Sequence, residues 1–508
     1  MAQDHVLLPR TGNQARGLAQ YALDFMAGRH GQPDPSVYRM VERFHLDSMA
    51  CAVSALACGA NAPNVLRREA LEYTSVPGAR GAFCFGSDVP VQPEKAVLAN
   101  CSAVREWDAN GTNFGYNPAR GDVAGEFGHN DFYPVAVAAA QWQGLDGERT
   151  LRAMLLVDEI RGRLAEVFSL KEHKIDHVVH GAIASAAVYG ACLGATVDEI
   201  ESALGLVVAH YVPFRAIRAG KQLSDSKGAS AAFSAETAVA SVRRAMRGFV
   251  GPADIFRNPE AIFCLFGGPP AADSSPFDLR LATSGRDFAV MGMHFKLGLY
   301  EHQSAGAIQG LMDLFERYPA LVDDAGLLRR VRITIYEPAF GIIGDAAKRD
   351  PRTRQSADHS MVYIIATLLR KAFERRRGGW RELMLLPADY DDAGLFHPLA
   401  RAIMEKIEFR HGGRAYDEKY PDGIPTSIEI EHEALGSLSS GLVMYPMGHA
   451  RSASTGLDEL LEHKFRLLAS LGVADADVLR QRLTNLAQKS PAEIAGLYRF
   501  ELKEGDGR

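Results

Sequence analysis

The sequence lacks several patterns that define large classes of protein. Its six cysteines lie apart in 508 residues and form no C-x-x-C pair, so zinc ribbons and cysteine-bound clusters are unsupported. No apolar run approaches the roughly 18–20 residues of a membrane span. The opening segment MAQDHVLLPRTGNQ has no charged lead before a long apolar core, which a signal peptide would have. Scattered cysteines in apolar surroundings fit reduced thiols, so we expect a cytoplasmic protein without membrane contact.

A concentrated positive charge is also missing. The formal net charge is −6, with 23% charged and 47% hydrophobic residues, which is ordinary for a soluble globular protein. Because phosphate binding requires a dense positive face, we expect no nucleic-acid partner. A local cationic pocket can still form in a mildly acidic protein, so acidic small molecules stay open as ligands.

Helical patterns fill the first half of the chain. Thr196 followed by Glu199 forms a capping box, the pattern that opens a helix. Residues 61–94 instead predict loop with at most one short strand. Together these patterns predict an all-helical domain of about 270 residues. The helices are expected where apolar residues recur at intervals of three and four, over residues 15–25, 36–58, 95–107, 150–168, 176–192 and 228–247.

The composition changes near residue 268, where GGPPAADSSP is rich in Gly, Pro and Ser and indicates a boundary. Beyond it, alternating patterns predict strands over 329–336 and 426–433, with helices over 303–318 and 360–375. The tail, 456–502, returns to helix and is expected to pack on the first domain. We predict a mainly α fold: a large helical domain from residues 1–275 and 455–508, and a smaller α+β lid domain over 276–454.

The stretch from residue 105 to 133 has a composition that a hydrophobic core does not need. It contains five glycines, three aspartates, two glutamates and one histidine between two apolar, helix-like runs. Loops held between rigid helices often carry catalytic groups. The candidates are Asp108, Thr112 and His129, with Asn130 and Asp131 as supports. The alternative is a solvated surface loop with a helix-capping aspartate.

Four cations lie in the segment RAIRAGKQLSDSK, which precedes a helix rich in small residues. A helix N-terminus with cations nearby favours bound anions, and exposed loop charges are the alternative. Lys227 is the strongest candidate because it adjoins the small-residue helix, where a backbone can approach a ligand closely. The four are Arg215, Arg218, Lys221 and Lys227.

Histidines and a lysine recur further along the chain. Lys296 stands among apolar residues in MHFKLGLYEHQSA, with His302 close behind, although a lysine can also snorkel from an apolar strand. Asp358-His359 opens a helix, where Asp358 could simply cap it. His173, His177 and His180 would share one face of a helix, a spacing that could bind a metal. Helix capping and packing explain the three histidines more simply, and we expect no metal.

Taken together, and in matching order from about residue 15 to 500, these segments resemble the MmgE/PrpD family. DANGT from Asp108 resembles the family's D-x-N-x-T loop, and EFGH ending at His129 its E-W-G-H. YPMGHAR, from Tyr445 to Arg451, is similar to its Y-P-I-G-H-A-R. Further likenesses are the D-H pair at Asp176-His177, the lysine Lys227, the F-K and later histidine at Phe295-Lys296 and His302, and Asp358-His359-Ser with Tyr363.

The resemblance implies the two domains already predicted, a homodimer, and work on citrate-like acids without metal or other cofactor. It implies a hydro-lyase that dehydrates a citrate-like 2-hydroxy tricarboxylate. The alternatives are a decarboxylase or isomerase of a related acid such as cis-aconitate, and a ligand-binding member without catalysis. The implied site lies between the domains, where six residues would converge: Asp108, Thr112, His129, Lys227, Lys296 and His302.

Roles follow from the chemistry of such a dehydration. A proton beside a carboxylate is a weak acid, so its removal requires a base and nearby cations. We expect Asp108 or His129 to be the base, and the other, or His302, to be the acid. Lys227 and Lys296 would anchor substrate carboxylates. Binding roles fall to Thr112, Asn130, Arg218, Lys221, Asp358 and His359, and a structural role to His449.

The sequence also departs from the family around this site. The segment between Thr112 and His129 is longer than the resemblance predicts, and the spacing from Lys296 to His302 is shorter. Gly111 replaces an acidic residue, and Lys227 is followed by Gly-Ala. These departures fall at the expected pocket, so the family is better supported than the substrate.

Overall fold

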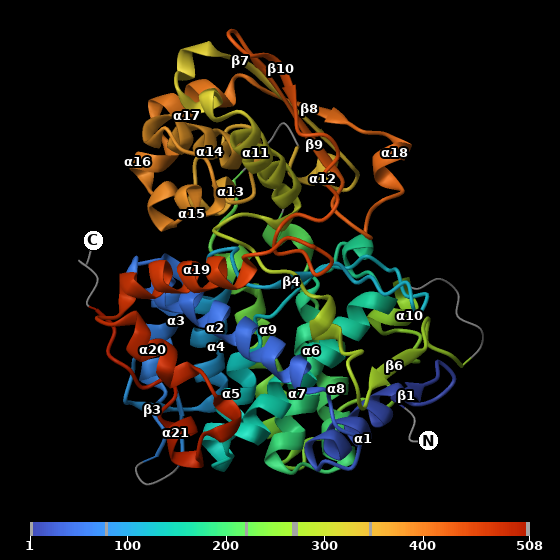
Figure 1. Ribbon diagram of the computed structural model, residues 1–508. Helices are drawn as coiled ribbons and strands as arrows, with labels where there is room; N and C mark the ends of the chain where they lie inside the picture. Colours follow the sequence, from blue (N-terminus) through green and yellow to red (C-terminus); the bar gives the residue numbers. More distant parts are fainter. Residues whose placement is uncertain (1–3, 77–79, 219–221, 267–272, 345–347, 504–508) are drawn as a thin grey trace.

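The computed structural model describes residues 4–76, 80–218, 222–266, 273–344 and 348–503. Figure 1 shows a large helical part and a smaller part in which helices pack against a sheet. The mainly α fold with a smaller α+β part is confirmed. The helices of the large part are α1 (Gln14–Met26), α2 (Pro35–Ala57), α3 (Asn61–Glu72), α4 (Pro93–Arg105), α5 (Tyr133–Gln143), α6 (Gly147–Val167), α7 (Val178–Leu193), α8 (Val197–His210), α9 (Ser226–Ala245), α10 (Ile262–Phe266), α19 (Leu457–Gly472), α20 (Ala476–Leu483) and α21 (Pro491–Ala495).

Local sequence sets where these helices begin. Asp34 caps α2 by accepting the Ser36 N–H at 2.8 Å, and the predicted capping box of Thr196 and Glu199 opens α8. Such caps satisfy backbone N–H groups that have no partner inside the helix. α7 is apolar and buried on nearly every face, and it packs between α6 and α9. The C-terminal helices return to the first part as predicted, because α19 packs on α2 and α21 on α5.

The smaller part is built on a four-stranded sheet of order β10-β9-β7-β8. β7 pairs antiparallel with β9 and parallel with β8, so Val331 faces Ile430 on one side and Ile407 on the other. Along β7 the aliphatic residues are buried and the arginines between them face outward, the alternation that predicted this strand. The strands are β7 (Leu328–Ile335), β8 (Ile407–His411), β9 (Thr426–His432) and β10 (Gly436–Ser439). The helices are α11 (Ala305–Arg317), α12 (Ala339–Ile342), α13 (Arg354–Ala357), α14 (Met361–Arg375), α15 (Trp380–Leu383), α16 (Asp392–Leu395), α17 (Pro398–Met404) and α18 (Arg414–Asp417).

The prediction for residues 61–94 is wrong. The chain forms α3 there, followed by the short strands β2 (Ala82–Phe83) and β3 (Pro90–Val91). Ala62, Leu66 and Ala70 are four residues apart and form a narrow buried face. The other residues of α3 are mostly polar, and its Val65 is exposed, so its helical pattern is weak in the sequence.

The large part also contains a two-stranded sheet whose strands lie far apart in the sequence. β1 (His5–Leu8) pairs antiparallel with β6 (Leu279–Ala282), so the chain still lies against the helical part after residue 276. The predicted domain limits stay a prediction. No single helix in the described ranges is long and apolar enough to cross a membrane. α2 and α3 pass that test only as a pair bent by 88°.

Candidate active site

The segment after α4 is buried in the molecule. Its strands β4 (Thr112–Asn113) and β5 (Gly128–His129) pair antiparallel, and Thr112 also exchanges backbone hydrogen bonds with His294. Asp108 is 1% exposed and Asp131 is fully buried. The alternative of a solvated surface loop is therefore wrong for the residues that carry the predicted chemistry.

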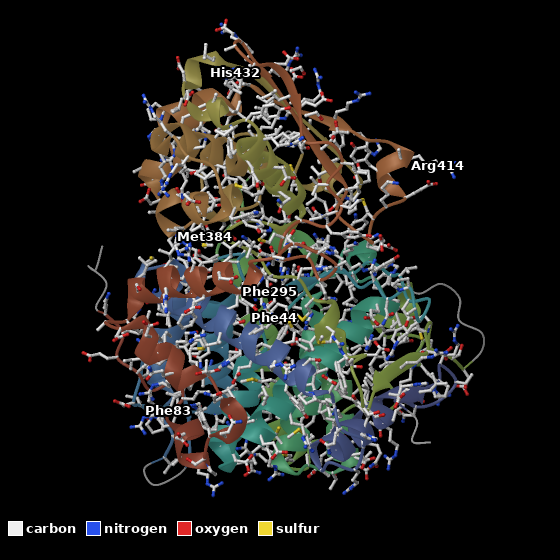
Figure 2. The ribbon with its side chains drawn as sticks, in the orientation of Figure 1. Phe44, Phe83, Phe295, Met384, Arg414 and His432 are labelled. Carbon is white, nitrogen blue, oxygen red and sulfur yellow. The ribbon has the colours of Figure 1, made fainter. Side chains whose placement is uncertain are left out.

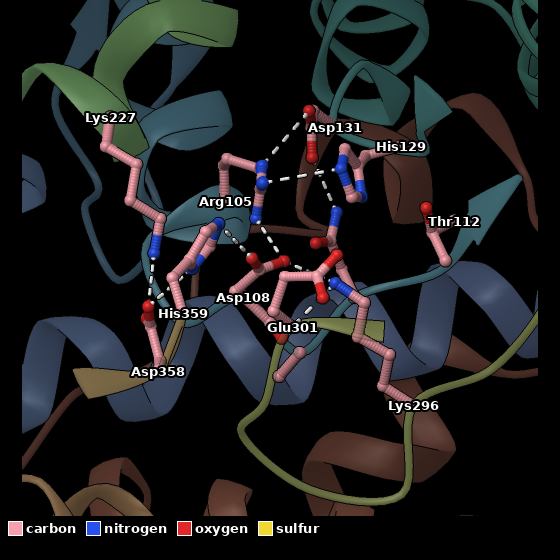
Figure 3. A network of polar contacts seen from close by, with 12 residues as sticks. Arg105, Asp108, Thr112, His129, Asp131, Lys227, Lys296, Glu301, Asp358 and His359 are labelled. Atoms are coloured by element: carbon pink, nitrogen blue, oxygen red, sulfur yellow. Dashed lines mark hydrogen bonds and ion pairs between the residues drawn. The ribbon is translucent and has the colours of Figure 1, made fainter. Parts of the chain in front are cut away.

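Asp108 is the centre of a buried network of charges (Figure 3). Arg105 donates to its Oδ1 at 2.8 Å, and the Lys296 ammonium contacts the same oxygen. Nε2 of His359 lies 3.0 Å from Oδ2. Burial alone would raise the pKa of Asp108, but the charges of Arg105 and Lys296 outweigh it and hold that pKa well below its ordinary value. Asp108 is therefore a carboxylate at neutral pH.

A second carboxylate, Asp358, continues the network. The Lys227 ammonium lies 2.6 Å from its Oδ1, and Nδ1 of His359 lies 2.8 Å from the same atom. Burial lowers the pKa of Lys227 to about 8, despite the opposing charge of Asp358. Burial also lowers the pKa of His359 to about 3, so the ring is neutral and has a single N–H. Asp108 and Asp358 therefore compete for that one proton donor.

The other side of Arg105 faces His129. The guanidinium lies 3.4 Å from Nε2 of His129 and 3.7 Å from a carboxylate oxygen of Asp131. Burial, followed by the charge of Arg105, lowers the pKa of His129 well below its ordinary value. Its Nδ1 is buried and has no hydrogen-bond partner in the described part of the chain. His129 is thus a neutral imidazole. Because arginine only donates, Nε2 accepts from Arg105 and Nδ1 carries the proton.

Profiles of protein families match nearly the whole chain. The MmgE/PrpD N-terminal domain matches residues 16–273, and the MmgE/PrpD C-terminal domain matches residues 300–489. The chain belongs to the MmgE/PrpD family.

Similar proteins carry names from one kind of chemistry. A 2-methylcitrate dehydratase of Salmonella typhi is 26% identical over 468 residues, covering 86% of this chain and 87% of that protein. A 2-methylcitrate dehydratase of Escherichia coli is 26% identical over 444 residues, covering 82% of this chain and 84% of that protein. An alkylcitrate dehydratase of a fungal species is 23% identical over 481 residues, covering 88% and 86%.

In this MmgE/PrpD protein, six of the predicted site residues lie in the network itself: Asp108, His129, Lys227, Lys296, Asp358 and His359. Thr112 and Asn130 border it, and their side chains hold the loop. The Thr112 hydroxyl donates to the Gly128 carbonyl at 2.9 Å, and the Asn130 amide donates to the Ser48 hydroxyl at 3.0 Å.

Arg218 lies further out. Its guanidinium pairs with Asp176 and donates to the Ser230 hydroxyl at 3.1 Å. Asp176 precedes His177, whose ring centre is 5.2 Å from that of His129. Arg218 therefore holds Asp176, the neighbour of the histidine that packs against His129. Its substrate-binding role stays a prediction. Lys221, the other cation predicted to bind substrate, lies outside the described residues.

His302 ends a column of three stacked imidazoles. Its ring centre is 5.2 Å from that of His294, which is 4.1 Å from that of His449. Both ring nitrogens of His302 are buried without a described partner. Burial, followed by the charge of Lys296, lowers the pKa of His302 well below its ordinary value. The column ends at a cavity of about 140 Å³ lined by His294, His449 and Arg451.

The three histidines considered for a metal do not share a helix face. His173 ends a short 3-10 helix (Lys171–His173), whereas His180 lies inside α7. His173 stacks on Phe168 and Phe266, and Nε2 of His180 contacts the Phe168 carbonyl at 3.0 Å. That expectation of a shared face is wrong, because the chain turns between the two helices. No group of three or more His, Cys, Asp or Glu side chains among the described residues is arranged to hold a metal.

Three groups at the site were missed from the sequence. Arg105 looks in the sequence like an ordinary residue near the end of a helix. In the structure it is the last residue of α4 and contacts both Asp108 and His129. Glu301 precedes His302 and faces the network (Figure 3). Lys464 lies in α19, far along the chain, and is fully buried beneath Lys296. A charged residue inside an apolar helical pattern was the available signal for Lys464.

Proposed function

We propose that the protein is a hydro-lyase that dehydrates a citrate-like 2-hydroxy tricarboxylate, of the type that converts 2-methylcitrate to 2-methyl-cis-aconitate, without a metal. The observation that carries the proposal is the set of buried cations, Arg105, Lys227 and Lys296, around Asp108. Such a set suits an acid with several carboxylates and stabilises the negative charge that develops when a neighbouring proton leaves. The names of the similar proteins support the same reaction class.

The base in this proposal is His129. Asp108 has a very low pKa and is held by two cations and His359, so it is a weak base. His129 is neutral, and its basic atom is Nε2, which becomes available when Arg105 turns from it to a substrate carboxylate. A substrate with three carboxylates would raise the pKa of His129, because nearby negative charge favours the imidazolium. Asp108 would then orient Arg105 and Lys296 toward the substrate.

Neither Asp108 nor His302, the residues predicted as the acid beside His129, suits that role. The acid must hold a proton at neutral pH and pass it to the leaving hydroxyl. Asp108 is ionised and cannot do so. Burial lowers the pKa of His302, so its ring is neutral. A neutral imidazole is a poor proton donor.

The proposal is tested by incubating the purified protein with 2-methylcitrate and with citrate and following the alkene product by NMR. We expect dehydration of at least one acid, with the rate unchanged by a chelator. Release of carbon dioxide from cis-aconitate, without dehydration, would overturn the proposal in favour of decarboxylation. Interconversion of cis-aconitate with an isomer would favour isomerisation, and binding without turnover would favour a ligand-binding protein.

Two lysine variants connect the activity to the site. Lys227→Ala and Lys296→Ala are expected to lower turnover at least about 10²-fold, because each removes a cation that holds and stabilises the substrate. Lys503→Ala, at an exposed position, is the matched control and is expected to retain full turnover. We also propose a homodimer, which light scattering of the purified protein tests.

A further inference from the structure

Glu301 lies in the turn between Lys296 and the 3-10 helix His302–Ser304. One oxygen of its carboxyl group accepts the Gln303 N–H at 2.8 Å. Its own N–H donates to the Asp358 carbonyl at 2.8 Å. The residue is therefore fixed both to this helix and to the segment that carries Asp358 and His359. The second carboxyl oxygen, Oε1, makes no hydrogen bond or ion pair with a described residue.

The carboxyl group of Glu301 points into the charged network. Figure 3 shows it beside Asp108 and the ammonium of Lys296. Burial, followed by the negative charge of Asp108, raises the pKa of Glu301 to about 7, against the lowering effect of Lys296. Three further titratable groups interact with it electrostatically: Lys348 and the phenols of Tyr336 and Tyr420. At neutral pH a large fraction of Glu301 is therefore a carboxylic acid, unlike Asp108 and Asp358.

We propose that Glu301 is a further catalytic residue, the acid that protonates the leaving hydroxyl of the substrate. This inference rests on the proposed dehydration. His129 removes the proton beside a carboxylate, and the electron pair of that C–H bond forms the double bond. The C–O bond breaks, and the hydroxyl leaves as water with the proton of Glu301. The proton on His129 then returns, through water, to the Glu301 carboxylate, so atoms and charge balance over the cycle.

The position of Glu301 favours this role over a purely structural one. A cap on a short 3-10 helix needs one oxygen, and an exposed Asp or Ser would serve. Here the cap uses one oxygen and leaves Oε1 at the network. Lys227 and Lys296 also carry protons, but their ammonium groups are paired with Asp358 and Asp108. Glu301 thus brings an acidic proton beside Lys296, where a substrate carboxylate would bind (Figure 3).

The test compares Glu301→Gln and Glu301→Asp with the wild-type protein. The glutamine variant keeps an oxygen for the Gln303 N–H but has no acidic proton. We expect its kcat to fall at least about 10²-fold with KM nearly unchanged, and the aspartate variant to recover part of the loss. In the wild-type protein kcat should fall as the pH rises through about 7, where Glu301 loses its proton, and Glu301→Gln should lack that limb.

A substrate analogue separates chemistry from folding. Fluoride leaves without needing a proton, so an analogue with fluorine in place of the leaving hydroxyl should restore Glu301→Gln to within about tenfold of wild type. Loss of activity on both substrates would overturn the proposal in favour of a structural role. Full turnover of Glu301→Gln on the hydroxy acid would overturn it while the proposed dehydration stands. A wild-type protein that dehydrates neither acid would refute both.

Discussion

Lys464 lies directly beneath Lys296 and donates to its backbone carbonyl at 2.8 Å. The same ammonium donates to the Ala109 carbonyl at 2.6 Å and pairs with Asp47 at 2.6 Å. Ala109 follows Asp108 in the chain, so one buried lysine holds the backbone at both members of the Asp108–Lys296 pair. α19, which carries Lys464, thus positions a site whose reacting groups come from other parts of the chain.

Lys464→Met is expected to lower both stability and turnover. The substitution leaves Asp47 buried without its cation, and breaking one side of a buried pair costs about 3–5 kcal/mol. It also removes the hydrogen bonds to two backbone carbonyls beneath the site. We therefore expect kcat to fall by a larger factor than the affinity for the substrate. Urea unfolding and steady-state kinetics measure the two effects. Lys503→Met, at an exposed position, is the control, and a Lys464→Met protein with wild-type stability and kcat would contradict the positioning role.

Gly111 is expected to accept a side chain only at a cost in stability. A Cβ at this position would meet carbon atoms of the Phe44 ring at 2.5 Å. That ring cannot move easily, because it stacks on Phe295 (Figure 2) with ring centres 3.9 Å apart. Phe295 directly precedes Lys296 in the chain. Gly111→Ala should cost about 1–3 kcal/mol of unfolding free energy and lower turnover.

The control for that change is Gly292→Ala, where no atom of a described residue lies within 4 Å of an added Cβ. Thermal unfolding of the two variants provides the comparison. Equal unfolding temperatures would show that the loop can move aside, and would remove the packing explanation for glycine at position 111.

Local chemistry explains what the sequence could predict, and contacts between distant segments explain what it could not. The start of α8 was predictable because its cap lies within four residues, and β7 because its alternation is local. α3 was missed because its buried face is narrow. At the site, residue types in their local context predicted Asp108, Lys227 and Lys296, and the family resemblance predicted that they would converge. Glu301 acquires its raised pKa only through burial against groups from other segments, which no local pattern records.

The Asp358–Lys227 pair predicts a specific loss of stability in acid. Burial opposes ionisation, but the charge of Lys227 lowers the pKa of Asp358 to about 2, from an ordinary value near 4. Between these values the unfolded chain binds more protons than the folded one. The stabilisation is therefore complete above about pH 4 and is lost as the pH falls through about 2.

Asp358→Asn should remove that part of the pH dependence. Unfolding temperatures measured from pH 6 to pH 2 should fall less steeply for this variant than for wild type. Asp323→Asn, at an exposed position, should follow the wild-type curve. Parallel curves for Asp358→Asn and wild type would mean that the pair is formed equally in the unfolded state.

The choice of His129 over Asp108 as base makes a prediction about proton exchange. If a carbanion forms before the C–O bond breaks, the base can exchange the substrate's reacting hydrogen with deuterium from heavy water. This exchange needs the base but not the acid. His129→Gln keeps an acceptor toward Arg105 but has no basic nitrogen, so it should lose exchange and at least about 10²-fold of kcat. Because no buried charge is left unpaired, its stability should change little.

Asp108→Asn should behave differently. It leaves Arg105 and Lys296 buried without their carboxylate, so unfolding free energy should fall by about 3–5 kcal/mol and KM should rise. Some exchange should persist, because His129 is intact. The two variants thus separate the roles by NMR of the recovered substrate. If Asp108→Asn abolishes exchange while His129→Gln retains it, Asp108 is the base, and the low pKa that its cations impose must then be relieved when the substrate carboxylates bind them.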